Sequence, residues 1–192
     1  MFSFRLAELH PIVVHFPIAL LIASVALDFG GVVLRRAGLT TAATWCLVLG
    51  VPGAFAALFS GWLSERDINL ALAGSLLHIH KVFAVVTSLS FSLLLLIRLL
   101  WLLPGILKWI RCSFVGSEAV IGRVETRLRV WVPALYLKPL PRLVVALYLL
   151  ASVVSVVLLG LTGYLGGALV YDQGVAVPPL RLGRVGSVTA SL

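Results

Sequence analysis

Four long stretches without a charged side chain constrain this sequence more than any other feature. They cover residues 9–27, 37–64, 82–97 and 143–171. A helix needs about 20 mostly apolar residues to cross a lipid bilayer. We therefore predict four transmembrane helices, at Pro11–Val33, Thr41–Leu63, Ser75–Leu103 and Leu143–Val170.

The composition excludes a soluble globular protein. Of the 192 residues, 61% are hydrophobic and only 11% are charged, whereas about a quarter of the residues in soluble domains carry charge. Consecutive helices joined by short connections pack antiparallel as a bundle. We expect an all-α membrane protein, with residues 1–192 forming one domain of four transmembrane helices. Because only Arg5, offset by Glu8, precedes the first stretch and no clear small-residue cleavage site follows it, we expect a retained helix rather than a signal peptide.

The net charge of +8 predicts membrane topology rather than nucleic-acid binding, because the cations gather in two of the three connections. Cytoplasmic connections carry the excess of Lys and Arg. The first connection holds Arg35 and Arg36, whereas the second, residues 64–74, holds one Arg against two acidic residues. We expect a bacterial inner-membrane protein with both termini outward. The third connection is then cytoplasmic, with the cations Arg98, Lys108, Arg111, Arg123, Arg127, Arg129, Lys138 and Arg142.

The third connection, residues 99–141, mixes most of these cations with Trp and Tyr residues. This pattern is typical of helices that lie on an anionic membrane surface, and we predict such helices at Gly105–Phe114 and Arg123–Tyr136. Docking of a partner subunit is the alternative interpretation.

All four histidines lie near the predicted outward ends of two helices, His10 and His15 on the first and His78 and His80 on the third. Ionisable residues inside a membrane are costly and usually functional. The members of each pair point about 140° and 200° apart on a helix, so one member of each pair can face the interior of the bundle. Two facing clusters favour a bound cofactor over isolated packing histidines. Asp28 lies near the opposite end of the first helix, where we expect it to reach the interface or to pair with Arg35.

Three motifs resemble the DUF2231 family of predicted membrane proteins. The stretch His10-Pro11-x-x-Val14-His15-Phe16-Pro17-Ile18-Ala19-Leu20 and the stretch Gly163–Val175 resemble the two signature regions of the family, and His80–Ala84 resembles the start of its third helix. Two features depart from the family pattern: Gln173 stands where members often have His, and the long basic connection resembles an insertion. Domains of this family are sometimes joined to Rieske or cytochrome modules, so the resemblance implies electron transfer.

We predict an integral membrane haem b protein that transfers electrons at the outward face of the membrane. It would be a subunit of a larger complex with other membrane or periplasmic redox proteins, rather than a stand-alone enzyme. Neutral imidazole is a standard axial ligand of haem iron. His15 and His80 lie deeper than their neighbours and are the first candidate pair of ligands. His10 and His78 would ligate a second haem or bond to the propionates, for which Arg66 and Lys81 are candidate cations.

Two alternatives stay open at the level of the sequence. The chain can be a cofactor-free structural or assembly subunit of a membrane complex, in which the histidines bond across helices. It can also hold zinc or copper, although Asp172 is the one further metal ligand near the histidines. No nucleophile triad, phosphate-binding loop or acid pair supports hydrolytic or kinase chemistry.

Overall fold

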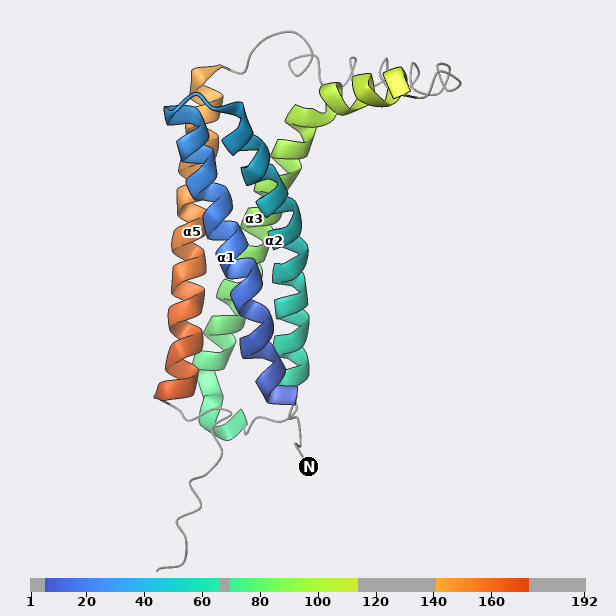
Figure 1. Cartoon of the computed structure of the whole chain (residues 1–192). Coiled ribbons are helices and arrows are strands. Elements are labelled where there is room, and N and C mark those ends of the chain that lie inside the picture. The colour runs from blue at the N-terminus through green and yellow to red at the C-terminus, as the bar shows by residue number, and fades with distance from the viewer. Residues whose placement is uncertain (1–5, 66–69, 114–140, 173–192) are drawn as a thin grey trace, which may run out of the picture.

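The computed structural model describes residues 6–65, 70–113 and 141–172 of the chain. Nearly all of these residues belong to long helices, and the described part contains no strand, which confirms the predicted all-α class (Figure 1). The helices are α1 (Leu6–Val33), α2 (Ala37–Ser64), α3 (Leu70–Ser113) and α5 (Arg142–Tyr171). Each contains a segment long and apolar enough to cross a bilayer, namely His10–Val33, Ala37–Ser64, Gly74–Leu103 and Arg142–Tyr171.

A three-residue turn joins α1 to α2. The amide of Arg36 donates to the Gly31 carbonyl over 3.0 Å and the amide of Arg35 reaches the Val32 carbonyl over 3.4 Å, the bonding pattern of a Schellman motif. Arg35 occupies the left-handed position of this motif with φ of 52°, where glycine is the usual residue. The turn reverses the chain and sets α2 antiparallel against α1.

Helix α3 changes direction near both of its ends. Gly74 has φ of 38° and ψ of −132°, a conformation that favours glycine, and it separates residues 70–73 from the transmembrane segment. At the other end α3 runs beyond the predicted Leu103 to Ser113 and turns sideways, away from the other helices (Figure 1). The predicted interfacial segment at 105–114 is therefore helical as far as Ser113, whereas Arg123–Tyr136 lies outside the described residues.

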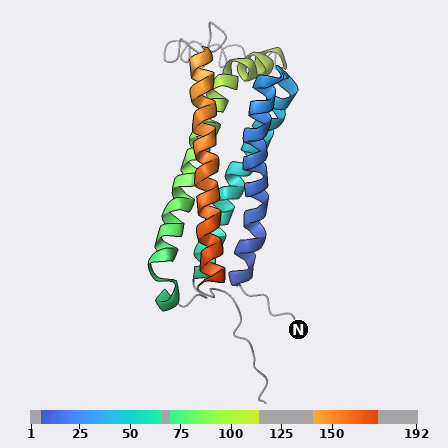
Figure 2. The ribbon, with the colours of Figure 1, turned by 90° about the vertical axis from the view of Figure 1, so that its left-hand side faces the viewer.

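The four helices form a ring in which each has two neighbours (Figure 2). Helix α1 packs against α2 and α5, and α3 packs against the same two helices. Helices α1 and α3 are therefore diagonal to one another, and so are α2 and α5.

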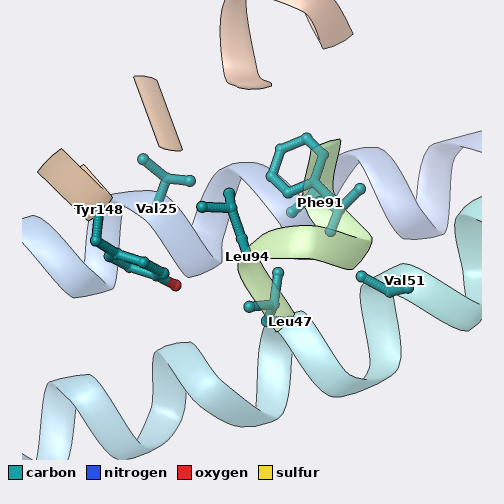
Figure 3. Packing of buried hydrophobic residues seen from close by; sticks show 7 residues of the cluster. Val25, Leu47, Val51, Phe91, Leu94 and Tyr148 are labelled. Atoms are coloured by element: carbon teal, nitrogen blue, oxygen red, sulfur yellow. The ribbon is translucent and has the colours of Figure 1, made fainter. Parts of the chain in front are cut away.

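The apolar core lies in the middle of this ring. Phe91 is fully buried, and Leu21 and Leu47 are each 1% exposed. Figure 3 shows how side chains from all four helices meet there. The cluster consists of Leu21, Val25, Leu47, Val51, Phe91, Leu94 and Tyr148. The outer faces of the helices are also apolar, with Leu143 and Val33 largely exposed, as expected for surfaces that contact lipid tails.

Candidate functional site

His10 lies near the start of α1 and packs against the last turns of α2. Its Nδ1 atom is 3.0 Å from the carbonyl oxygen of Ala57 and 3.0 Å from Oγ of Ser60. The Ser60 hydroxyl itself donates to the Ala57 carbonyl over 2.9 Å. The imidazole is half-buried, so α2 fixes the orientation of its ring.

His80 has an equivalent environment near the start of the transmembrane part of α3. Its Nδ1 atom is 3.1 Å from the carbonyl oxygen of Thr162 on α5. The hydroxyl of Thr162 is 3.0 Å from that of Thr87, which lies about two helical turns beyond His80 on α3. This imidazole is also half-buried, and α5 fixes its ring as α2 fixes that of His10.

These hydrogen bonds leave each imidazole with one free lone pair. A backbone carbonyl can only accept, so Nδ1 of His10 and of His80 must carry the proton that is shared. The other ring nitrogen, Nε2, then has a lone pair, and within the described part of the chain neither Nε2 has a hydrogen-bond partner. A neutral imidazole held by an Nδ1–H to carbonyl bond is the typical state of a histidine metal ligand.

A glycine lies beneath each of the two rings. A methyl group on Gly61 would come within 3.1 Å of Cε1 of His10, and one on Gly166 within 3.1 Å of Cε1 of His80. Each glycine comes four residues after the carbonyl that holds the ring. The absence of a side chain therefore allows each imidazole to lie close against the neighbouring helix.

His10 and His80 lie at the same end of the diagonal helices α1 and α3, and both are half-buried. His15 and His78 are instead exposed on the outside of the bundle, and Nδ1 of His15 contacts the carbonyl of Pro11 within its own helix. The predicted first pair was His15 and His80. On α1 it is His10, and not His15, that is half-buried and bonded to a carbonyl of a neighbouring helix as His80 is.

The predicted propionate partners have separate outcomes. The ammonium of Lys81 forms a two-oxygen ion pair with the Glu65 carboxylate, at 2.8 and 2.9 Å. This pair links α3 to the end of α2 beside the histidines. Arg66 lies outside the described residues.

The described residues were also compared with the needs of a bare metal ion. Within residues 6–65, 70–113 and 141–172, no group of three or more His, Cys, Asp or Glu side chains is arranged to hold a metal ion. Zinc and copper sites usually require three or four protein ligands, whereas haem iron requires at most two.

The comparison with protein families agrees with this all-helical membrane architecture. A family model described as predicted membrane protein (DUF2231) matches residues 7–179. The chain belongs to this family. The match covers all four helices and both imidazoles, so it confirms the family that the sequence motifs indicated. No curated protein and no solved structure matches the chain.

The DUF2231 chain carries a second polar cluster at the opposite end of the bundle. Arg98 of α3 forms an ion pair with Asp28 of α1 and donates to the Tyr148 hydroxyl over 3.1 Å. Its other terminal nitrogen reaches the Thr40 carbonyl and the Thr44 hydroxyl of α2, at 3.3 and 3.2 Å. Asp28 is 2% exposed and Arg98 6% exposed. All four helices therefore meet at one buried ion pair.

This cluster corrects two predictions. Asp28 does not pair with Arg35, because Arg35 lies in the exposed turn after α1 and the Asp28 carboxylate points to Arg98. Arg98 is not one of the free cations of the third connection, since it lies inside the bundle.

The spacing of charged residues within the spans could have identified the inward histidines. A charged side chain within a span must face the interior of the bundle, and 18 residues make about five full helical turns. His10 lies 18 positions before Asp28, and His80 lies 18 positions before Arg98. His15 and His78 stand on other faces by the same arithmetic.

Proposed function

We propose that this protein binds one haem b between His10 and His80 and transfers electrons at the end of the bundle that holds these residues. One observation carries the proposal. Two half-buried imidazoles on diagonal helices each donate Nδ1–H to a backbone carbonyl and keep Nε2 free. The Nε2 atoms of His10 and His80 would hold the iron of a bound haem, since neutral imidazole is a standard haem ligand.

Haem would supply a one-electron redox centre, and the chain would supply its position and surroundings. The carbonyls of Ala57 and Thr162 hold both rings in the tautomer that presents Nε2. The hydrogen bonds that Nδ1–H donates also make the imidazoles more basic, which strengthens metal binding. Two protein ligands leave no open coordination position, so the site suits electron transfer rather than oxygen chemistry.

The surroundings support a redox subunit at the outward face of a bacterial inner membrane. The basic connections favour the cytoplasmic side, which would place the histidines outward, where periplasmic or membrane partners could exchange electrons. Lys81 is held by Glu65 at the same end and remains a candidate for the haem propionates. Arg66, which follows Glu65 in the sequence, is the second candidate.

A visible spectrum of the purified protein, with haem counted per polypeptide, tests the proposal. We expect a Soret band that sharpens on reduction and about one haem per chain, because one pair of imidazoles binds one iron. His10→Ala and His80→Ala should each lose most of the haem, because alanine offers no lone pair. His15→Ala and His78→Ala are the matched controls, since these histidines are exposed, and they should retain it.

Three results would overturn the proposal. A folded, colourless parent protein would remove haem altogether. Retention of haem by both His10→Ala and His80→Ala would place the haem elsewhere. Loss of haem in His15→Ala with retention in His10→Ala would favour His15 and His80, the pair predicted from the sequence.

One observation also favours a cofactor-free structural subunit. The histidine bonds to Ala57 and Thr162 tie α1 to α2 and α3 to α5, which would stabilise the bundle without a ligand. In that case His10→Ala and His80→Ala would lower the melting temperature of a protein that has no visible absorbance.

A further inference from the structure

The two halves of the chain repeat one arrangement of residues. The residue numbers of His10 and His80 differ by 70, and those of Asp28 and Arg98 differ by the same amount. Ala57 and Thr162, which hold the imidazoles, differ by 105, as do Gly61 and Gly166 beneath the rings. Helices α1 and α2 therefore form one hairpin, and α3 and α5 form a second hairpin with equivalent residues.

Burial follows the same two offsets. Buried Pro17, Leu21, Ser24 and Asp28 of α1 correspond to buried Thr87, Phe91, Leu94 and Arg98 of α3. The four buried residues of α5, Tyr148, Ser152, Ser155 and Leu169, correspond to buried Ala43, Leu47, Gly50 and Ser64 of α2.

The packing of the helices agrees with a pseudo-two-fold axis along the bundle. A half-turn about this axis takes α1 to α3 and α2 to α5, and each pair of neighbours becomes another pair of neighbours. Parallel internal repeats of this kind occur in membrane proteins. Equivalent residues of the diagonal helices α1 and α3 approach this axis: Asp28 and Arg98 form an ion pair there, and Leu21 and Phe91 lie in one core cluster. His10 and His80 are the equivalent pair toward the other end of the bundle.

We propose that Asp28 and Arg98 are positioning residues that fix the rotation of the two hairpins, so that His10 and His80 face one another. The role of the histidines as ligands rests on the proposed function, whereas the fixed rotation does not. Because about five turns separate the charge from the histidine on each helix, both lie on one face. A rotation that moved either imidazole off the axis would also break the ion pair and turn a charge toward lipid.

The chemistry of the Asp28–Arg98 pair fits a role in specifying one arrangement of the hairpins better than a role in stabilising the bundle. The Asp28 Oδ1 and Arg98 Nε atoms are buried, and neither has a hydrogen-bond partner in the described part of the chain. A buried ion pair with incomplete hydrogen bonding is often no more stable than apolar residues of the same size. Polar pairs of this kind can instead specify register and partner.

The test compares two forms of the full chain, the parent and a variant that combines Asp28→Leu with Arg98→Met. In both forms Cys46 and Cys112 are replaced by Ser. This neutral double variant leaves no unpaired buried charge and should fold. Crosslinking between cysteines at positions 10 and 80 (His10→Cys with His80→Cys) measures the rotation of the two hairpins without haem. The control pair is His15→Cys with His80→Cys, because position 15 lies on a different face of α1; we call this the off-face pair. In the parent background we expect the first pair to crosslink and the second pair to crosslink poorly.

In the neutral double variant, the crosslink between positions 10 and 80 should fall several-fold and the off-face crosslink should rise. With the histidines restored, the same variant should give a weaker or heterogeneous haem spectrum. Asp28→Glu with Arg98→Lys keeps both charges and should crosslink like the parent, and Ser152→Ala controls for a buried polar change.

Unchanged crosslinking in the folded neutral variant would overturn the proposal. A neutral variant that does not fold would overturn it too, since the pair would then be required for folding itself. A parent chain that shows the expected crosslinks but holds no haem would remove the proposed function and leave this inference standing.

Discussion

At the scale of single residues, the position of each imidazole depends on the glycine beneath it, which has no side chain to displace the ring. Gly61→Ala and Gly166→Ala would each place a methyl group 3.1 Å from a ring carbon, closer than ordinary contact. Each ring would have to move away from the carbonyl that holds it, so we expect each variant to lose haem or to shift its reduction potential. Haem per polypeptide and a redox titration measure both effects.

The matched control for the glycine variants is Gly163→Ala, on the same helix as Gly166. A methyl group there meets no atom within 4 Å, and alanine favours a helix over glycine by about 1 kcal/mol. Haem content should stay at the parent level, with equal or higher thermal stability. Equal haem content in all three variants would mean that the rings do not lie on Gly61 and Gly166 in solution.

The sequence predicted that one histidine of each pair faces inward, but depth was the wrong guide to which one on α1. His15 lies deeper than His10, yet the inward face of α1 runs through Pro17, Leu21, Ser24 and Asp28. Two residues, from His15 to Pro17, turn a helix by about 200°, whereas the seven from His10 to Pro17 return it to nearly the same face. Depth along a helix therefore says little about direction, which is set by packing.

At the scale of elements, the helices were predictable because charge cannot be placed cheaply in a bilayer. Each predicted span agrees with an observed helix, and the observed helices are longer at one or both ends. The extension of α3 to Ser113 was not predicted, since the sequence beyond Leu103 mixes apolar and basic residues. Such a mixture fits an interfacial helix without indicating that it continues a transmembrane one.

The α1–α2 turn gives a stability prediction. Arg35 has φ of 52°, a region that costs a residue with a side chain about 1–2 kcal/mol. Arg35→Gly should remove most of this strain and raise the free energy of unfolding by about 0.5–1 kcal/mol, because the gain exceeds the added backbone entropy. Thermal unfolding in detergent measures the change.

Arg36→Gly is the control for that variant. It removes the same charge from the same turn at a residue with φ of −108°, where glycine relieves no strain. Its stability should be unchanged or lower. A gain of the same size from both variants would assign the effect to charge rather than to backbone conformation.

At the scale of the whole molecule, the four helices were predictable but the duplication was not. Between the two hairpins the equivalent buried residues differ in type, with Pro17 matched to Thr87 and Ala43 to Tyr148. The histidines and the glycines beneath them keep the same residue, as do two valines of α2, since Val48 and Val51 match Val153 and Val156. A repeat that is conserved in geometry rather than in residue type becomes visible only when burial and contacts are known.

The orientation of the whole bundle gives the last prediction. The first connection carries Arg35 and Arg36 and the third is strongly basic, so the positive-inside rule favours both on the cytoplasmic side. Gly38→Cys, exposed near the first connection, and Tyr171→Cys, 88% exposed at the opposite end, are the reporters, in a background in which Cys46 and Cys112 are Ser. In intact spheroplasts a membrane-impermeant maleimide should label Tyr171→Cys and should label Gly38→Cys only after lysis.

The reverse labelling pattern would mean that the bundle has the opposite orientation in the membrane. The start of α1 and the end of α5 lie at the same end of the bundle (Figure 1), so the histidines near the starts of the α1 and α3 spans would then face the cytoplasm. The haem variants would be unaffected, because the ligands and the carbonyls that hold them are fixed within the bundle. The electron donors and acceptors would instead have to be sought among cytoplasmic proteins, and the basic connections would face the periplasm, away from the anionic inner leaflet.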